Sequence, residues 1–308
     1  MISRWSDFWF TPSSPIDLGV SRFFFFGGVF AFYAREDFRA WGAVSDAFWL
    51  PMPLFTVLHL TPLSPDLLGV LQVVWRIALV LSAVGFFTRT STIVASLLGV
   101  YLLGLPHNFG QTYHFDALLV IAMLVLACSR AGDAFSVDAW LNGDPGPERS
   151  GEYTWPIRAI WVAMSLVFFA AGLAKLRYGG LEWITSSNMS ILLTRALYHV
   201  SDADPVTRAG LWIAGHPWLA SAVAAAAVVT EVAFPAALFS RRARLVLVPA
   251  AVAMLVGIRL LMGPTFGGFL IANVFWVPWH ALAARVEAWV VARRHTANRA
   301  AIDSGSRR

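Results

Sequence analysis

Lys175 is the only lysine in this chain of 308 residues, in which the other strongly basic residues are arginines. A lysine in an apolar environment loses its proton more readily than one in water and can then act as a general base, whereas arginine stays charged. Lys175 follows the apolar run from Trp161 to Leu173, so its position and its type both suit proton transfer. The alternative is that arginine replaced lysine throughout the chain, and that Lys175 extends from a helix end toward lipid headgroups.

Charged residues inside apolar segments form a second group of candidates. Each costs about 2.5 to 3.5 kcal/mol to insert into a membrane, so each needs a partner or a purpose. Glu231 is the only acid deep within such a segment, and we expect Arg259 to pair with it through a bidentate hydrogen bond. Arg76 would attract an anion or help to hold Glu231, and Arg22 is the fourth such charge. A buried ion pair that only sets the helix register is the alternative to a substrate site.

Two histidines and a carboxylate stand together before an apolar segment. They are His107, His114 and Asp116, and histidine can carry protons near neutral pH. A metal site from these three residues is conceivable, but Pro106 and Gly110 interrupt any helix that would align the histidines. We therefore predict no metal, an interfacial position for His107, and a His114 side chain that points into the bundle.

Composition defines the broad class of the protein. Hydrophobic residues make up 58% of the chain and charged residues 13%, and the mean hydropathy is +0.65, which is far from an ordinary soluble domain. The 14 tryptophans and 23 phenylalanines suit helix ends in a membrane interface. Arginines gather in short loops and near the C-terminus, which indicates membrane topology and argues against nucleic-acid binding. The single cysteine, Cys128, excludes an intramolecular disulfide.

Apolar segments predict an all-α integral membrane protein with about eight transmembrane helices between residues 18 and 283. Residues 1–17 would be an N-terminal cytoplasmic segment, and residues 284–308 a basic cytoplasmic tail. Two further pieces, residues 48–60 and 189–200, are expected to lie along the interface. The eight predicted spans are residues 18–34, 67–87, 91–105, 115–129, 156–174, 217–239, 245–262 and 266–283.

The distribution of basic residues predicts the orientation. With eight spans, most arginines fall on the same side as both termini, and short cytoplasmic loops are enriched in basic residues. We therefore expect an N-in and C-in protein of the bacterial inner membrane. This orientation puts Lys175 and His114 near the outer face. Because no removable signal peptide is evident, the first apolar segment is expected to remain as an anchor.

Three blocks of sequence carry a family resemblance. The first joins Gly85-Phe-Phe-Thr-Arg89 to Tyr113-His-Phe-Asp116 and Phe135-Ser-Val-Asp-Ala-Trp140. The second is Phe168-Phe-Ala-Ala-Gly-Leu-Ala-Lys175-Leu, followed by Trp183, and the third is Glu231-Val-Ala-Phe-Pro235 with Arg259-Leu-Leu-Met-Gly263. They resemble the HTTM (horizontally transferred transmembrane) domain, which is related to the membrane region of vitamin K-dependent gamma-carboxylases.

The resemblance implies a lyase and oxidoreductase chemistry. In the carboxylases a lysine deprotonates a reduced quinone, oxygen converts the quinone to an alkoxide base, and that base takes a proton from a glutamyl γ-carbon before carbon dioxide adds. Lys175 matches that lysine, and His114 matches a functionally important histidine. A reduced, vitamin K-like quinone would be the cofactor. Apart from the resemblance, we expect a cavity that opens toward the outer face around Lys175, His114 and the Glu231–Arg259 pair. Trp183 would close this cavity at the interface, and Asp116 would belong to the charge network.

The chain also departs from the carboxylases. They continue into a large luminal domain, whereas an arginine-rich stretch follows the last span here, so glutamate carboxylation on a peptide is less expected than quinone chemistry. The substrate would be a peptide or a small molecule. The competing interpretation is a non-enzymatic membrane carrier, or an assembly factor for peptide maturation or export. Transporters often contain paired repeats, and no convincing internal repeat is visible here.

Overall fold

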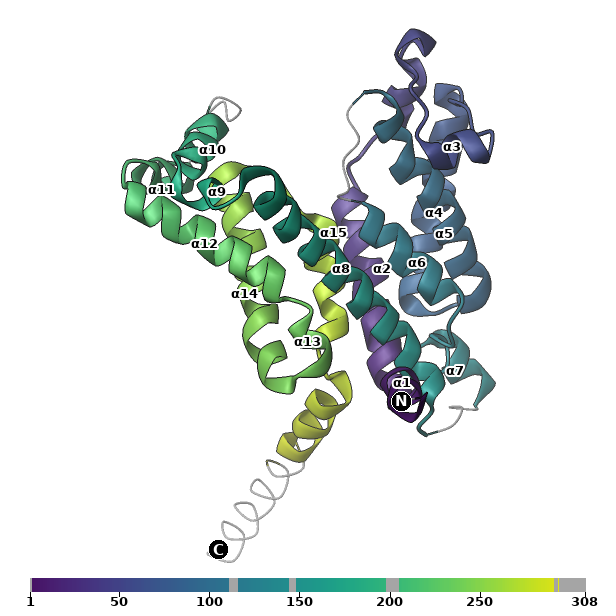
Figure 1. Cartoon of the computed structure of the whole chain (residues 1–308). Coiled ribbons are helices and arrows are strands. Elements are labelled where there is room, and N and C mark those ends of the chain that lie inside the picture. The colour runs from purple at the N-terminus through teal and green to yellow at the C-terminus, as the bar shows by residue number, and fades with distance from the viewer. Residues whose placement is uncertain (1, 111–115, 144–147, 198–204, 291–292, 294–308) are drawn as a thin grey trace, which may run out of the picture.

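The computed structural model describes residues 2–110, 116–143, 148–197, 205–290 and 293 (Figure 1). Over these residues the chain forms helices and one isolated β-bridge, between Ser13 and Ser150. A helix without a label, Trp279–Val290, follows a bend of 64° near the C-terminal end. The labelled helices are α1 (Ile2–Phe10), α2 (Pro15–Tyr33), η1 (Phe38–Ala43), η2 (Asp46–Phe48), α3 (Pro53–Val57), α4 (Pro65–Val84), α5 (Thr88–Gly104), η3 (Leu105–Asn108), α6 (Ala117–Ala127), α7 (Val137–Asn142), η4 (Gly151–Tyr153), α8 (Thr154–Gly179), α9 (Glu182–Thr185), α10 (Asn188–Leu197), α11 (Pro205–Ala214), α12 (Pro217–Ala233), α13 (Ala236–Phe239), α14 (Arg241–Met262), α15 (Gly267–Ala272) and η5 (Asn273–Trp276).

The helices confirm an all-α polytopic membrane protein. Five of them are long and apolar enough to cross a membrane, namely α2, α4, α5 with η3, α8 with η4, and α14. Counting each of two bent pairs as one span, α11 with α12 and α15–η5 with the last helix, gives up to seven. The remaining predicted span corresponds to α6, which has 11 residues. At a rise of about 1.5 Å per residue, α6 is shorter than a hydrocarbon core of about 30 Å.

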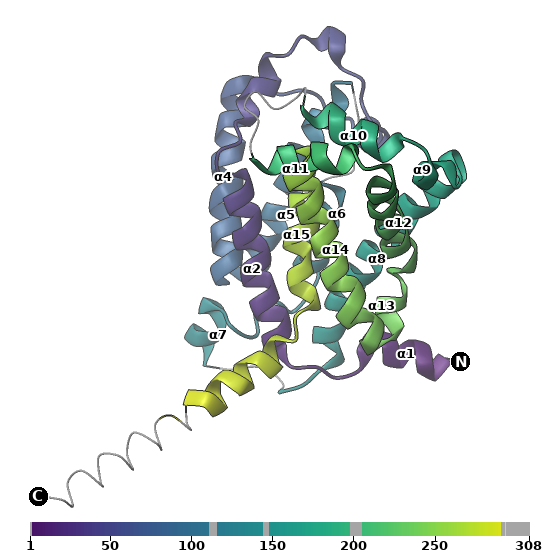
Figure 2. The same ribbon diagram turned by 90° about the vertical axis from the view of Figure 1, so that its left-hand side faces the viewer.

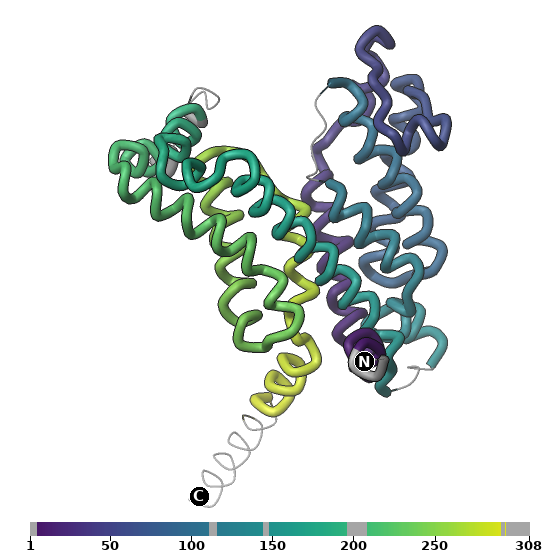
Figure 3. Tube along the Cα trace, in the orientation of Figure 1, coloured from purple at the N-terminus to yellow at the C-terminus, as the bar shows by residue number. Residues whose placement is uncertain are grey.

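Two groups of helices meet along α2, α8 and α15 (Figures 1 and 3). On one side α4 packs against α2 and α5, and α5 packs against α6; on the other side α12 packs against α8 and α14. Helix α15 contacts α2, α6, α8 and α14, and Figure 2 shows α2, α15 and α14 side by side. The main buried core therefore runs through both groups.

The outer surface of the bundle is apolar. On α4, Val70, Val73 and Ile77 are 59%, 51% and 55% exposed, whereas Leu68 and Trp75 on the other face are fully buried. This helical spacing divides α4 into a core face and a lipid face. Helix α14 has only 11% of its most apolar window buried within the protein. In a lipid bilayer these exposed apolar side chains contact acyl chains and are removed from water. The surface of the bundle therefore suits a membrane environment.

Several of these helices start at residues that favour a helix N-terminus. Proline occupies the first turn of α2, α4 and α12, where its missing N–H costs no intrahelical bond. Ser14 and Ser64 cap α2 and α4, because each hydroxyl oxygen accepts a hydrogen bond from a backbone N–H in the first turn. These boundaries follow from residues next to one another in sequence.

Arg22, one of the four predicted intramembrane charges, has a structural role. Its guanidinium group is fully buried and donates hydrogen bonds to the carbonyl oxygens of Ala131, Ala83 and Phe135, at 2.8, 3.3 and 2.6 Å. These bonds tie α2 to the end of α4 and to the segment after α6. Carbonyl groups that no helix uses thereby gain a donor.

Both predicted surface pieces contain short helices. Residues 48–60 include the end of η2 and helix α3. Helix α10 covers most of residues 189–200, and its side chains Met189 and Leu193 are buried against α11, α12 and α14. Residues 198–200 lie outside the described part of the chain. Helix α10 therefore packs into the protein through one face, as its amphipathic pattern permits.

Candidate functional site

Lys175 and Glu231 form an ion pair between α8 and α12. The Nζ atom of Lys175 lies 2.6 Å from each carboxylate oxygen of Glu231. The lysine side chain is 24% exposed and the glutamate side chain 8% exposed, so the amine is the more accessible member. An isolated charge within an apolar helix is costly. The ion pair lowers this cost, because each residue is the counter-charge of the other.

The structure corrects the expected partner of Glu231, which was Arg259. Arg259 lies in the last turn of α14, where its Nη1 atom donates a hydrogen bond to the carbonyl oxygen of Gly263 at 2.9 Å. Arg76 donates to the carbonyl oxygen of Tyr33 at 3.4 Å and to the carbonyl oxygen of Glu36 in the loop after α2. Within the described residues, neither arginine forms an ion pair with Glu231. Each arginine therefore satisfies carbonyl groups at or just beyond the end of a helix, Arg259 after α14 and Arg76 at the end of α2.

A glycine on α8 allows the two helices to approach closely. A Cβ atom on Gly172 would lie 2.9 Å from the Cβ atom of Glu231 and 3.1 Å from the backbone nitrogen of Val232. Small residues at such crossings bring helix backbones together in membrane proteins. Gly172 lies one helical turn before Lys175, so this contact brings the Glu231 carboxylate within reach of the Lys175 side chain.

We expect Gly172→Ala to lower the free energy of unfolding by about 1 to 3 kcal/mol, because overpacking forces the backbone of α12 away from α8. The measurement is thermal unfolding of the purified protein in detergent. Gly257→Ala is the matched control, since a Cβ atom at Gly257 inside α14 meets nothing within 4 Å. That control should be as stable as the wild type or slightly more so. Equal stability of the two variants would contradict the close-contact interpretation.

Trp183 completes the surroundings of the amine. Its ring centre lies 5.3 Å from Nζ of Lys175, which is within the range of a cation–π interaction. Helix α9 carries Trp183, and Gly179 gives it room, because a Cβ atom there would come within 2.9 Å of the Cβ atom of Trp183. Trp183 also packs against the buried cluster that contains Met189 and Leu193. The Lys175 amine therefore lies between a carboxylate and an aromatic ring.

Asp116 belongs to a separate polar group. The hydroxyl of Tyr33, at the end of α2, donates a hydrogen bond to Asp116, and Nε2 of His107 lies 3.4 Å from the other carboxylate oxygen. His114 lies outside the described residues, so its role stays a prediction. Within the described residues no hydrogen bond or ion pair joins this group to Lys175. Tyr33 was not predicted, and its place at the end of an apolar segment is the only sequence signal for it.

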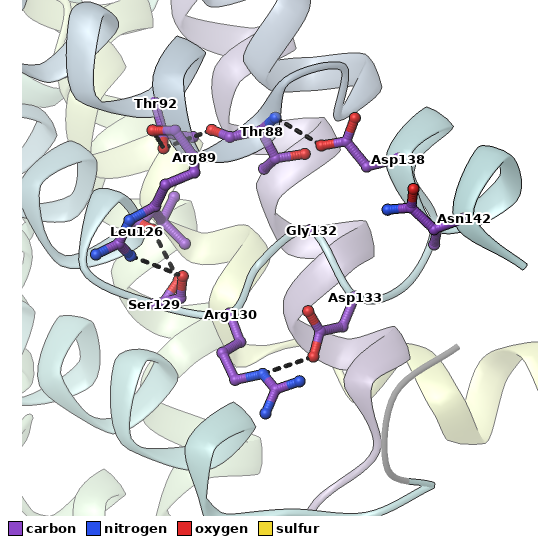
Figure 4. A pocket seen from close by; sticks show the side chains of 11 residues that line it. Thr88, Arg89, Thr92, Leu126, Ser129, Arg130, Gly132, Asp133, Asp138 and Asn142 are labelled. Atoms are coloured by element: carbon purple, nitrogen blue, oxygen red, sulfur yellow. Dashed lines mark hydrogen bonds and ion pairs between the residues drawn. The ribbon is translucent and has the colours of Figure 1, made fainter. Parts of the chain in front are cut away.

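Asp138, in the block that runs from Phe135 to Trp140, caps helix α5. Its two carboxylate oxygens accept hydrogen bonds from the backbone N–H groups of Phe87 at 2.9 Å and Thr88 at 2.6 Å. Figure 4 shows Asp138 beside Thr88. Both residues line a pocket of about 330 Å³. A carboxylate suits the positive end of a helix dipole. This part of the family-like block therefore positions α5.

We expect Asp138→Ala to destabilise the protein by about 1 to 2 kcal/mol, because two N–H groups at the start of α5 lose their acceptor. Asp138→Asn keeps one acceptor oxygen and should fall between Asp138→Ala and the wild type. Thermal unfolding in detergent measures both. The capping role is wrong if the asparagine variant is as unstable as the alanine variant, or if neither variant differs from the wild type.

Long apolar helices with exposed apolar faces, together with an ion pair between α8 and α12, define a polytopic helical membrane protein. A family model described as HTTM domain matches residues 10–263. The chain therefore belongs to the HTTM domain family, and the resemblance seen in the three sequence blocks is confirmed. Comparisons with curated proteins and with solved structures give no match.

Proposed function

We propose that this HTTM protein is a quinone-dependent membrane enzyme whose proton chemistry is like that of the gamma-carboxylases, with Lys175 as the base. The observation that carries the proposal is the pairing of the chain's one lysine with a buried glutamate beside an aromatic ring. In an apolar helix bundle such groups are costly and commonly mark a functional site.

Glu231 gives Lys175 a way to become neutral. Transfer of a proton from Nζ to the carboxylate, along a hydrogen bond of 2.6 Å, converts the ion pair into an amine and a carboxylic acid. A medium of low dielectric constant penalises charged forms relative to neutral ones. The amine, which is the more exposed partner, then accepts a proton from an acidic hydroxyl group. The resulting ammonium balances the charge of the oxygen that it has deprotonated.

The surroundings of Lys175 suit the ring of a reduced quinone. Trp183 offers an aromatic face, and Lys175 offers a hydrogen-bond partner for a hydroxyl group. Trp183 packs in turn against the apolar side chains of Met189 and Leu193, and apolar surroundings suit a lipid-soluble molecule. Such a molecule, when bound, would supply the electrons that reduce oxygen. Lys175 and Trp183 would hold it, while Glu231 would retain the first proton.

The experiment is to give the purified protein, in detergent, a reduced naphthoquinone and oxygen. One molecule of each should yield one molecule of quinone epoxide and one of water, and epoxide is followed by chromatography. Labelled carbon dioxide and a glutamyl peptide in a parallel reaction test for carboxylation. If the wild-type protein forms no more epoxide than a sample without protein, across several quinones, the enzymatic proposal is wrong.

The second candidate is a non-enzymatic carrier, or an assembly factor for peptide maturation or export. It is favoured by the completeness of the ion pair, because Lys175 contacts both oxygens of a carboxylate that is only 8% exposed. A pair of this kind can brace two helices without any chemistry. In either case the protein would lie in the bacterial inner membrane, with both termini in the cytoplasm and Lys175 toward the outer face.

A further inference from the structure

Half-buried arginines gather around Trp161, toward the opposite end of α8 from Lys175. Arg158 and Lys175 are separated by about 25 Å along the helix axis, at a rise of about 1.5 Å per residue. Arg244, in the first turn of α14, approaches the same tryptophan ring. Arg158 falls within the predicted span of residues 156–174, yet it was not among the four intramembrane charges singled out from the sequence.

The two guanidinium groups are close together. Their central carbons lie 4.4 Å (Arg158) and 4.1 Å (Arg244) from the centre of the Trp161 ring, so the two carbons are at most 8.5 Å apart, the sum of those distances. The ring itself is fixed. Trp161 stacks on Trp276 with 4.3 Å between ring centres and an angle of 6°, and its Nε1 atom donates to the carbonyl oxygen of Phe275 at 2.8 Å.

These arginines lack an acidic partner in the described part of the chain, where every ion pair involves other residues. The Nε atom of Arg244 donates to the carbonyl oxygen of Ala237 at 3.1 Å, and within the described residues its terminal nitrogens form no hydrogen bond. The guanidinium groups of Arg158 and Arg244 are both positively charged, and their central carbons are at most 8.5 Å apart. Like charges at this separation repel one another, and an anion between them would relieve the repulsion.

We propose that Arg158 and Arg244 bind a phosphate group, and that this group is the headgroup phosphate of an anionic lipid. Planar guanidinium groups match phosphate oxygens, and charge-assisted N–H···O bonds of about 2.8 Å would let one phosphate accept from both arginines. The site goes beyond the proposed function, because it lies at the end of α8 remote from Lys175.

Exposed aromatic side chains beside the arginines favour a lipid over a soluble phosphate. The guanidinium carbon of Arg158 lies 5.0 Å from the ring centre of Phe8, and that ring lies 6.0 Å from the ring of Phe239. Phe239 is 80% exposed, and Trp5 in the same N-terminal helix is 67% exposed. Aromatic rings at a membrane interface contact acyl chains and headgroups together. On the predicted orientation this end faces the cytoplasmic leaflet, where anionic lipids attract basic side chains.

The test is a titration of the purified protein with phosphatidylglycerol, followed by native mass spectrometry. Arg158→Gln and Arg244→Gln should each weaken binding about tenfold, the loss expected for hydrogen bonds to a charged group. Arg242→Gln is the matched control, because Arg242 is an exposed arginine in the same first turn as Arg244. It should change the affinity less than about twofold, since a surface charge acts only weakly. If the first two variants lose no more affinity than Arg242→Gln, the proposal is wrong.

Two further arms identify the source of the phosphate. Diacylglycerol, which has the acyl chains without the phosphate, should bind equally to all four proteins. Inorganic phosphate should not displace phosphatidylglycerol at similar concentrations, and displacement would overturn the lipid assignment. Arg244→Gln could fail to fold, since Arg244 also holds α13 through Ala237. Phosphatidylglycerol should then still raise the melting temperature of the wild-type protein more than diacylglycerol does, and an equal rise would also overturn the proposal.

Discussion

Lys175→Arg is expected to reduce quinol-dependent epoxide formation at least about a hundredfold and to leave the protein folded. A positioned general base typically contributes about 10²- to 10⁴-fold to the rate. Arginine keeps the positive charge and can pair with both oxygens of Glu231, so the contact between α8 and α12 should survive. It cannot provide a neutral amine, so proton abstraction should stop. Epoxide formation and thermal unfolding, measured on the same preparation, test both parts.

A second charge on α8 provides the control for this substitution. Arg177 lies two residues after Lys175, in the last turn of the helix, is exposed, and contacts Tyr178 through its guanidinium group. Arg177→Gln removes a positive charge from the neighbourhood of Lys175 without touching the ion pair, and it should retain wild-type activity. A fully active Lys175→Arg protein would falsify the base role, whatever the result for Arg177.

Glu231→Gln is expected to lower the free energy of unfolding by about 3 kcal/mol, because it leaves the Lys175 ammonium without a counter-charge. Loss of one partner of a buried pair costs about 3 to 5 kcal/mol, and the partial exposure of Lys175 places the cost toward the lower end. The same variant should lose epoxide formation, since no carboxylate remains to take the proton from Nζ. Chemical or thermal unfolding in detergent gives the first quantity, and the quinol assay gives the second.

Exchanging the two residues separates a bracing role from a chemical one. Lys175→Glu combined with Glu231→Lys should restore most of the stability lost in either single variant, and a double-mutant cycle measures the coupling. Activity should not return, because the amine would then occupy the less exposed position on α12. If cellular function returns together with stability in the exchanged protein, the non-enzymatic candidate is favoured over the enzyme.

Most of the helical architecture could be predicted from the sequence. A span needs a run of apolar residues that matches the membrane thickness, and that requirement is local. The proline and serine residues that begin α2 and α4 are equally local signals. The short α6 shows where this reasoning weakens, because its apolar character alone does not indicate its length. The same local logic identified Lys175 and Glu231, since ionisable residues stand out against apolar neighbours.

The tertiary structure decided which of these residues meet. Glu231 contacts Lys175 in place of Arg259, because Gly172 lets α12 approach α8 at that level. Asp116 meets Tyr33, and Arg158 shares a tryptophan ring with Arg244. The residues of each pair lie in different segments of the chain, so their contact depends on how helices rotate and cross. The hydrophobic pattern of a single helix constrains its buried face, but the side chain of another helix that packs there follows from the assembly of the whole bundle.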